Sequence, residues 1–102
     1  MSSRRNSNVR VDAKLDLHGF TLAAAHRAVI NFVQQAYRDE LRCIEIITGR
    51  GDPQRGTGAL KREVPLWLEL PPVNHFILQV QVPVASRGGA YRVMLRRSKI
   101  SN

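Results

Sequence analysis

The stretch KLDLHGFTLAAAHRAVINFVQQAYRDE, residues 14–40, changes its hydrophobic period in a way that predicts a strand followed by a helix. Over residues 14–18 apolar and polar side chains alternate, as in a strand with one buried face. Gly19 ends this pattern, and Thr21 is suited to cap the helix that follows. Over residues 22–40 apolar side chains recur at helical spacing. The members of this stripe are Leu22, Ala25, Val29, Phe32, Val33, Ala36 and Tyr37.

Outward from this unit, the chain continues to alternate strand and helix. Residues 43–48 (CIEIIT) predict a second strand, and residues from about 57 to 69 a second helix with Pro65 inside it. Residues 75–82 (HFILQVQV) and 90–96 predict two more strands. Right-handed crossovers place both helices on one face, and a tight turn makes the last strand antiparallel to the third. We therefore predict an α/β (α+β) two-layer sandwich, β-α-β-α-β-β, with a four-stranded mixed sheet.

The charge balance points to an anionic partner. The chain has 102 residues, enough for one domain, and its 16 Lys and Arg against 8 Asp and Glu give a net charge of +8. Guanidinium groups fit phosphate oxygens, and a small domain of this charge attracts polyanions. We expect nucleic acid or a nucleoprotein as partner. We divide the chain into a disordered basic arm (1–12), the domain (13–97) and a basic tail (98–102).

Several protein classes are excluded by what the sequence lacks. Cys43 is the single cysteine, so there is no intramolecular disulfide, and no Cys/His cluster indicates a zinc site. The first ten residues lack the apolar segment of a signal peptide, and no apolar run is long enough to span a bilayer. We therefore expect a cytoplasmic monomer without a membrane partner. Cys43 itself is expected to be a small buried apolar residue.

The first candidate for chemistry is Asp16-Leu17-His18-Gly19. Residues two apart on a strand share a face about 6.6 Å apart, so Asp16 and His18 are predicted to lie together at the end of the first strand. Both would face away from the helices. A carboxylate beside an imidazole is the smallest pair that transfers a proton near neutral pH. The alternative is a surface histidine with an unrelated acidic neighbour.

The second candidate is Thr48-Gly49-Arg50-Gly51, after the next strand. Ligands gather at the carboxyl ends of parallel strands, so this turn lies beside His18 if the two strands are neighbours. Glycine lets the backbone approach an anion closely, and Arg50 can bind a phosphate with two parallel hydrogen bonds. The alternative is a plain glycine-rich turn with a solvated Arg50.

The start of the second helix is a third place where an anion could bind. Lys61 and Arg62 lie in its first turn, where positive charge opposes the helix dipole. The backbone N–H groups at a helix N-terminus favour an anion. We therefore expect both side chains to contact phosphate.

The face of the sheet that the helices leave uncovered is predicted to be polar and basic. Arg92 and Arg96 share this face of the last strand by parity. Gln79 and Gln81 share it on the third strand, together with Ile77. Such a face suits a phosphate backbone, although an ordinary solvated sheet face has the same pattern.

These motifs, taken in order, resemble the Smr (small MutS-related) domain family. LDLHG at 15–19 resembles the LDxHG signature that opens the domain, and ITGRG at 47–51 resembles its TGxG or HGxG signature. Further matches are Gly58-x-Leu60-Lys61, the segment VPLWL at 64–68 and the segment GAYRVMLRR at 89–97. The resemblance covers residues 14–97.

The resemblance implies a fold similar to that of the C-terminal domain of translation initiation factor three. It also implies that the chain nicks DNA or cleaves RNA, in some members messenger RNA on stalled ribosomes. Asp16 and His18 match the acid–histidine pair, and Gly19, Gly49 and Gly51 match the signature glycines. Two positions depart from the pattern: many members have a second histidine where Thr48 stands here, and often lysine where Arg50 stands.

The leading hypothesis is an endonuclease that cleaves a phosphodiester bond. In it, His18 is the general acid or base, oriented by Asp16, and Arg50 stabilises the negative charge that develops at phosphorus together with the Gly49 and Gly51 amides. The nucleic-acid contacts are Gly19, Thr48, Gly49, Gly51, Lys61, Arg62, Arg92 and Arg96. No metal-ligand set is predicted; Asp16 alone would be a thin Mg²⁺ site, which leaves Mg²⁺ open as a cofactor.

Two other hypotheses stand beside it. The first is a module that binds nucleic acid or the ribosome without cleavage, which the Thr48 departure favours. The second is an adaptor whose basic face or sheet edge meets an acidic protein; binding by this adaptor would not be competed by oligonucleotides.

Overall fold

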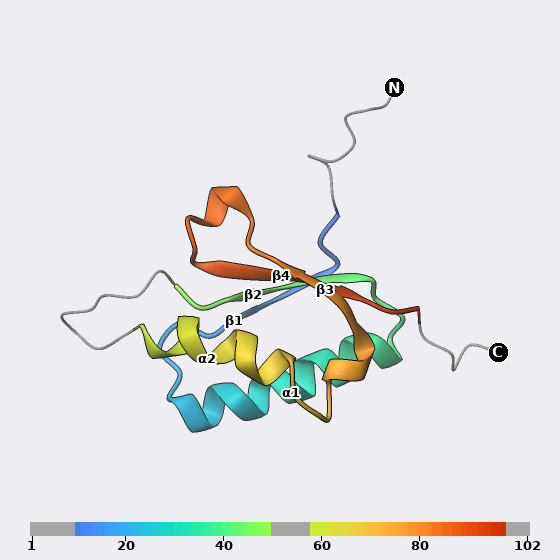
Figure 1. Cartoon of the computed structure of the whole chain (residues 1–102), viewed down its shortest axis with the longest axis horizontal. Helices are drawn as coiled ribbons and strands as arrows, with labels where there is room; N and C mark the ends of the chain where they lie inside the picture. Colours follow the sequence, from blue (N-terminus) through green and yellow to red (C-terminus); the bar gives the residue numbers. More distant parts are fainter. Residues whose placement is uncertain (1–9, 50–57, 98–102) are drawn as a thin grey trace.

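Strands and helices alternate along the chain in the computed structural model, which describes residues 10–49 and 58–97 (Figure 1). Two 3-10 turns flank the third strand, η3 (Asn74–Phe76) and η4 (Val84–Ser86). The elements in order are β1 (Ala13–Asp16), α1 (Leu22–Arg38), β2 (Cys43–Ile47), α2 (Ala59–Leu68), β3 (Ile77–Gln81) and β4 (Ala90–Leu95). The predicted element order is therefore confirmed.

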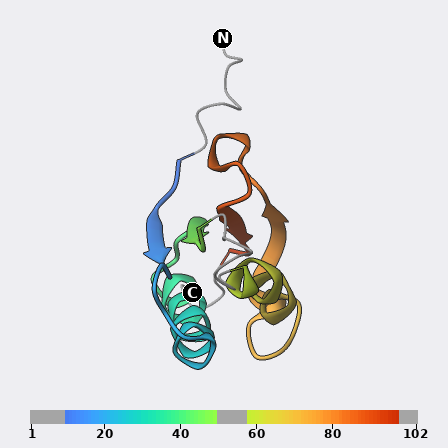
Figure 2. The ribbon, with the colours of Figure 1, turned by 90° about the vertical axis from the view of Figure 1, so that its left-hand side faces the viewer.

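The strands form one mixed sheet in the spatial order β1-β2-β4-β3. β1 and β2 are parallel neighbours, and β4 is antiparallel to both β2 and β3. Seen from the end of the molecule, both helices lie on the same side of the sheet (Figure 2). The two-layer sandwich predicted from the sequence is confirmed, with one face of the sheet left uncovered.

The core lies between α1, α2 and the covered face of the sheet. α1 buries Ala25, Val29, Val33 and Ala36 completely or nearly so. Thr21 caps it as predicted, since its Oγ1 accepts a hydrogen bond of 3.1 Å from the N–H of Ala24. The strands contribute residues of one parity, namely Leu15, Ile44, Ile46, Tyr91, Val93 and Leu95, and Leu17 just after β1 is buried with them.

Pro65 lies inside α2, and the helix continues beyond it to Leu68. Because proline has no N–H, it cannot donate to the carbonyl of Lys61 four residues earlier. That carbonyl instead accepts a hydrogen bond of 2.7 Å from the phenol of Tyr91 on β4. The proline thus frees an acceptor that ties the first half of α2 to the central part of the sheet.

The third strand departs from the predicted alternation. It begins at Ile77, after η3, and its pairing with β4 shifts between Ile77 and Gln79. A bulge of this kind inserts an extra residue, so Ile77 packs against the core and Leu78 is exposed. The prediction that Ile77 shares a face with the two glutamines is therefore wrong. Gln79 and Gln81 pair with β4 residues of the uncovered face, as expected.

The described part of the chain begins before β1. Asp12, which we assigned to the arm, donates its N–H to the carbonyl of Cys43 at 2.7 Å. Its carboxylate accepts from the N–H groups of Arg42 and Cys43, each at 3.1 Å. Asp12 therefore belongs with the domain. The remaining arm residues 1–9 and the tail residues 98–102 lie outside the described residues.

Candidate functional site

The DxH pair spans the end of β1 and the turn that follows. β1 ends at Asp16, and residues 17–20 form a tight turn in which the N–H of Phe20 donates to the carbonyl of Leu17 at 2.9 Å. Gly19 occupies the third position of this turn with φ +86°, as a type II turn requires. His18 thus lies in a turn and not on the strand, which corrects the spacing argument made from strand parity. Its side chain is exposed, as is that of Asp16.

The carboxylate of Asp16 bonds to the backbone of the turn. Its Oδ1 accepts a hydrogen bond of 2.9 Å from the N–H of His18. Among the residues that the structure describes, this is the one hydrogen bond given to that carboxylate. Asp16 therefore fixes the turn that carries the imidazole, in the manner of an Asx-turn. The direct carboxylate–imidazole contact that would orient the ring is not formed in this conformation.

The second glycine turn is held by the β3–β4 connection. The N–H groups of Thr48 and Gly49 both donate to the carbonyl of Gly89, at 2.9 and 3.0 Å. Thr48 is 6% exposed, and its hydroxyl donates to the carbonyl of Gly49 at 2.9 Å. The amide that we assigned to phosphate stabilisation at Gly49 is thus already bonded. Thr48 is a buried structural residue, while Arg50 and Gly51 lie outside the described residues.

The two turns lie at the same end of the molecule. β1 and β2 pair in parallel up to Asp16 and Ile47, and the N–H of Leu17 donates to the carbonyl of Ile47 at 2.8 Å. Both strands therefore end side by side, at the left of Figure 1, where α1, α2 and β4 begin. We call this end the rim and define it by residues 16–20, 48–49, 58–62 and 88–89. The predicted neighbourhood of the two motifs is confirmed.

The start of α2 brings two cations to the rim. A Cβ added at Gly88 would lie 3.0 Å from Nζ of Lys61, so this ammonium group rests against the turn that holds Thr48 and Gly49. A Cβ added at Gly58 would lie 3.5 Å from a guanidinium nitrogen of Arg62. The Arg62 side chain thus folds back toward the helix N-terminus, where an anion is favoured, while the Lys61 ammonium lies against the β3–β4 connection.

Arg92 lies on the uncovered face in the middle of β4, as parity predicted. It is the register partner of Glu45 on β2, and its Nη2 lies 3.9 Å from Oε1 of that carboxylate. Its Nε is buried without a hydrogen-bond partner among the described residues. This cation is therefore partly neutralised, and phosphate would have to compete with Glu45 for it.

Arg96 lies far from the rim, which corrects its grouping with Asp16 and His18. β4 starts at Ala90, which pairs with Ile47 at the rim, and runs away from it. Six residues of strand, at about 3.3 Å each, place Arg96 roughly 20 Å away. The backbone N–H of Arg96 donates to the carbonyl of Phe76 at 2.8 Å, at the start of β3.

One exposed residue of the rim was missed by the sequence reasoning. Phe20 is the last residue of the His18 turn and is 41% exposed, and Leu22 beside it is 43% exposed. An aromatic ring next to the histidine offers a flat apolar surface on which a base can stack. The signal was present in the sequence, as an aromatic residue placed outside the helical stripe that starts at Leu22.

The described residues contain neither a cluster of metal ligands nor a membrane-spanning helix. Within residues 10–49 and 58–97, no group of three or more His, Cys, Asp or Glu is placed to hold a metal ion. In the same residues, no helix combines the length and apolar character that crossing a membrane requires.

Cys43 is 3% exposed, as predicted, and this burial raises the pKa of its thiol, while the charge of Arg92 acts in the opposite direction.

Comparison with known proteins matches residues 15–96 to the model of the Smr domain. An uncharacterised protein of Treponema pallidum is 33% identical over 89 residues, covering 85% of this chain and 43% of that protein. The ribosome rescue factor SmrB of Shewanella sp. (strain ANA-3) is 31% identical over 64 residues, covering 63% of this chain and 34% of that protein. The chain thus spans less than half the length of these curated relatives.

A solved structure agrees with the sequence match. The crystal structure of YdaL, a stand-alone small MutS-related protein from Escherichia coli, superposes with a TM-score of 0.65 and 28% sequence identity. The superposition covers 82% of this chain and 64% of that one. It includes the two-helix, four-stranded arrangement described above.

Proposed function

We propose that this chain, which belongs to the Smr domain family, is an endonuclease that cuts a phosphodiester bond of RNA, or nicks DNA, at the rim. One observation carries the proposal: the parallel strands β1 and β2 end side by side and bring the His18 turn next to the second glycine turn. An exposed imidazole and several cations therefore lie within reach of one anionic ester. The net charge of +8 supports binding of a polyanion.

His18 is the proton-transfer group in this proposal. An imidazole can take a proton from an attacking hydroxyl or water and give one to the leaving oxygen. Asp16 acts as a positioning residue, because its carboxylate holds the His18 turn through the backbone N–H at 2.9 Å. The chemistry thus depends on one imidazole on a defined turn.

Cations would stabilise the charge that develops at phosphorus. The ammonium of Lys61 and the guanidinium of Arg62 lie at the rim, and the peptide bond of Gly49 leads directly to Arg50. Positive groups aimed at a developing charge lower the barrier most where water is excluded. Since the Gly49 amide donates to Gly89, this role falls to the side chains and to the residues that follow Gly49.

RNA on the ribosome is the substrate that we place first. The Shewanella relatives are named ribosome rescue factors, which supports a ribosomal partner for the domain that they share with this chain. A basic domain would also be attracted to ribosomal RNA by charge alone. Nicking of DNA is the alternative that the same rim chemistry allows.

The test compares the parent chain with His18→Ala on labelled RNA, labelled DNA and ribosome-bound message. Each substrate is incubated with magnesium and with a chelator, and the ends of the products are identified. Loss of a general acid–base group lowers the rate by about 10²- to 10⁴-fold, so His18→Ala should leave little cleavage. Arg27→Ala, which removes an exposed charge on α1, is the control. Equal rates for parent and His18→Ala would refute the proposal.

A binding module without chemistry is the second candidate, and two observations favour it. Thr48 is buried and bonded where many members of the family have a second histidine, and the Gly49 amide is bonded to Gly89. In this alternative the rim binds phosphate and the bond is not broken. Salt-sensitive binding of RNA with no cleavage of any of the substrates above would establish it.

A further inference from the structure

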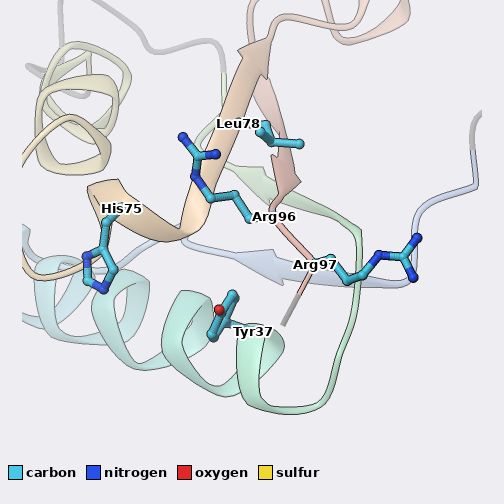
Figure 3. A pocket seen from close by; sticks show the side chains of 5 residues that line it. All are labelled: Tyr37, His75, Leu78, Arg96 and Arg97. Carbon is cyan, nitrogen blue, oxygen red and sulfur yellow. The ribbon is translucent and has the colours of Figure 1, made fainter. Parts of the chain in front are cut away.

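A second polar surface lies at the end of the molecule opposite the rim. A hollow of about 680 Å³ is lined there by Tyr37, His75, Leu78, Arg96 and Arg97 (Figure 3). Its walls come from the end of α1, from η3 and the start of β3, and from the two residues that follow β4. This volume lies within the range of small-molecule sites, about 300–1,000 Å³, and is sufficient for one nucleotide.

Aromatic rings make up one side of the hollow. The ring of Tyr37 stacks on the ring of Phe76, with centroids 4.2 Å apart. The ring centroid of His75 lies 4.1 Å from that of Phe76. Leu78 adds an apolar surface, because the bulge at the start of β3 turns it outward to 55% exposure. Rings and an exposed apolar side chain together suit the face of a nucleobase.

Two arginines also line the hollow, and their guanidinium groups point in opposite directions (Figure 3). Arg96 and Arg97 are both exposed, and neither forms an ion pair with any carboxylate of the described residues. Among the described residues, no Asp or Glu lines the hollow. This differs from Arg92, which shares its charge with Glu45. Guanidinium groups without a carboxylate partner are suited to a phosphate.

The hollow and the rim are joined by the length of β4. About 20 Å separates them along this strand, and Arg92 lies between them on the uncovered face. At a rise of about 3.4 Å per stacked nucleotide, this span corresponds to roughly six nucleotides, and to fewer in an extended strand. One strand can therefore reach both sites.

We propose that this hollow is a nucleotide subsite that holds an unpaired base and its phosphate on the same strand that is cut at the rim. The inference rests on the proposed function and deepens it, because it makes the substrate single-stranded and several nucleotides long. In a duplex the base faces are stacked and cannot lie against Tyr37, His75 or Leu78. The base packs against these side chains, and Arg96 binds the phosphate.

Binding of fluorescein-labelled oligouridylates and oligoadenylates tests the subsite, with lengths from about three to twelve nucleotides that bracket the 20 Å span. His18→Ala serves as the background so that the probes stay intact. Affinity should rise by about tenfold once the probe reaches both sites, since stacking of one base contributes about 1–3 kcal/mol. Arg96→Gln should abolish this rise and lower the salt slope by about 0.7, the contribution of one phosphate on a single strand.

Two further variants separate the base contact from the charge. His75→Ala, at an exposed position, should also abolish the rise of affinity with probe length, but it should leave the salt slope unchanged. Arg27→Gln, a matched loss of one exposed charge on α1, should keep the rise. Melting temperatures of all variants show whether each is folded.

Each outcome decides a different proposal. If Arg96→Gln and Arg27→Gln lose the same affinity at every probe length, the subsite is refuted and only general charge attraction is left. A chain that cleaves RNA but shows no rise with length refutes the subsite alone. A chain that shows the rise but never cleaves refutes the nuclease and keeps the subsite. Stronger binding of blunt duplex than of the single strand also counts against the subsite.

Discussion

The two glycine turns at the rim have the same kind of backbone and opposite surroundings. Gly19 and Gly49 have φ of +86° and +81°, and a Cβ added at either would meet nothing within 4 Å. The first turn, however, presents exposed side chains at Asp16, His18 and Phe20. In the second turn Thr48 is buried, and two N–H groups are bonded to one carbonyl of the β3–β4 connection.

The first turn therefore carries the side chains proposed for catalysis, whereas the second turn stabilises the fold. The turn that carries His18 is closed by local hydrogen bonds, from Phe20 to Leu17 and from His18 to the Asp16 carboxylate, and its exposed side chains can meet a ligand. The turn that carries Thr48 is part of the sheet framework, because Gly89 lies 40 residues away in sequence and holds it in place. A change in the first turn should therefore affect catalysis more than folding, and a change in the second should do the reverse.

Thr48→Val should have the largest effect on stability. It keeps the shape of the side chain but removes the hydroxyl that donates to the partly buried carbonyl of Gly49 and to the buried carbonyl of Gly89. An acceptor shielded from water that loses its donor costs about 1–3 kcal/mol. For a domain of this size each kcal/mol lowers the melting temperature by about 4–8 °C, which thermal denaturation measures. Thr48→Ser keeps the hydroxyl and is the control; a valine variant as stable as the parent would contradict the framework role.

Gly19→Ala should come next, with an effect on both stability and cleavage. An L-residue in the left-handed region costs about 1–2 kcal/mol, and here the strain is the whole cost because the space around Gly19 is open. The turn can relax only by moving His18, so the cleavage rate should fall together with the stability. Gly19→Asn, a residue that adopts positive φ more readily, should recover part of both. If alanine changes neither, the turn is not under this constraint.

How far the sequence predicted these turns follows from the range of the contacts that hold them. Strand parity and helical spacing located the elements, because both patterns are set by burial along a single segment. The neighbourhood of the two motifs followed from parallel crossover topology. The bonds from Thr48 and Gly49 to Gly89 could not be predicted, since they join residues about 40 positions apart and leave no local pattern.

The errors at His18 and Ile77 have a related cause. The alternation of a strand was assumed to extend beyond Asp16, the last residue of β1, to His18. Gly19, however, already required a turn with its own geometry. In β3 the bulge follows η3, where Phe76 stacks on Tyr37 of α1. That contact between distant segments sets the phase of the strand. The wrong placement of Arg96 came from treating a shared face as a shared location, although β4 runs away from the rim.

Asp16 offers a smaller and sharper test of the first turn. Asp16→Asn keeps an oxygen that can accept from the His18 N–H but removes the charge, whereas Asp16→Ala removes both. If Asp16 acts through the backbone, the Asp16→Asn variant should cleave at close to the parent rate. Alanine should lose a hydrogen bond worth about 1 kcal/mol in the turn, or roughly a fivefold lower rate.

The pH profile of cleavage is the companion measurement for these variants. A carboxylate that acts only through the backbone should leave the apparent pKa of the rate unchanged in Asp16→Asn. A large loss with asparagine, with the apparent pKa lowered, would show instead that the charge of Asp16 acts on the imidazole during catalysis.

The smallest expected effect concerns the stability of the domain at high pH. Burial raises the pKa of Tyr91 above its ordinary value of 10.0, and burial also raises that of Cys43 above its ordinary value of 9.0. Both groups are neutral when protonated, so the folded state retains protons that the unfolded chain has lost. Stability should therefore be constant below about pH 9 and fall as the pH rises through 9.0 and 10.0 toward the folded-state values.

Tyr91→Phe identifies the share of Tyr91 in this fall. It removes the phenol that donates to the Lys61 carbonyl, and so it should lower the free energy of unfolding by about 1 kcal/mol at neutral pH. Above pH 10 the variant should lose less stability than the parent, so the two denaturation curves should converge as the pH rises. Parallel curves would mean that the pKa of Tyr91 is the same in the folded and unfolded states, and that Cys43 alone carries the dependence. Cys43→Ala, which leaves the phenol in place, should then remove the slope.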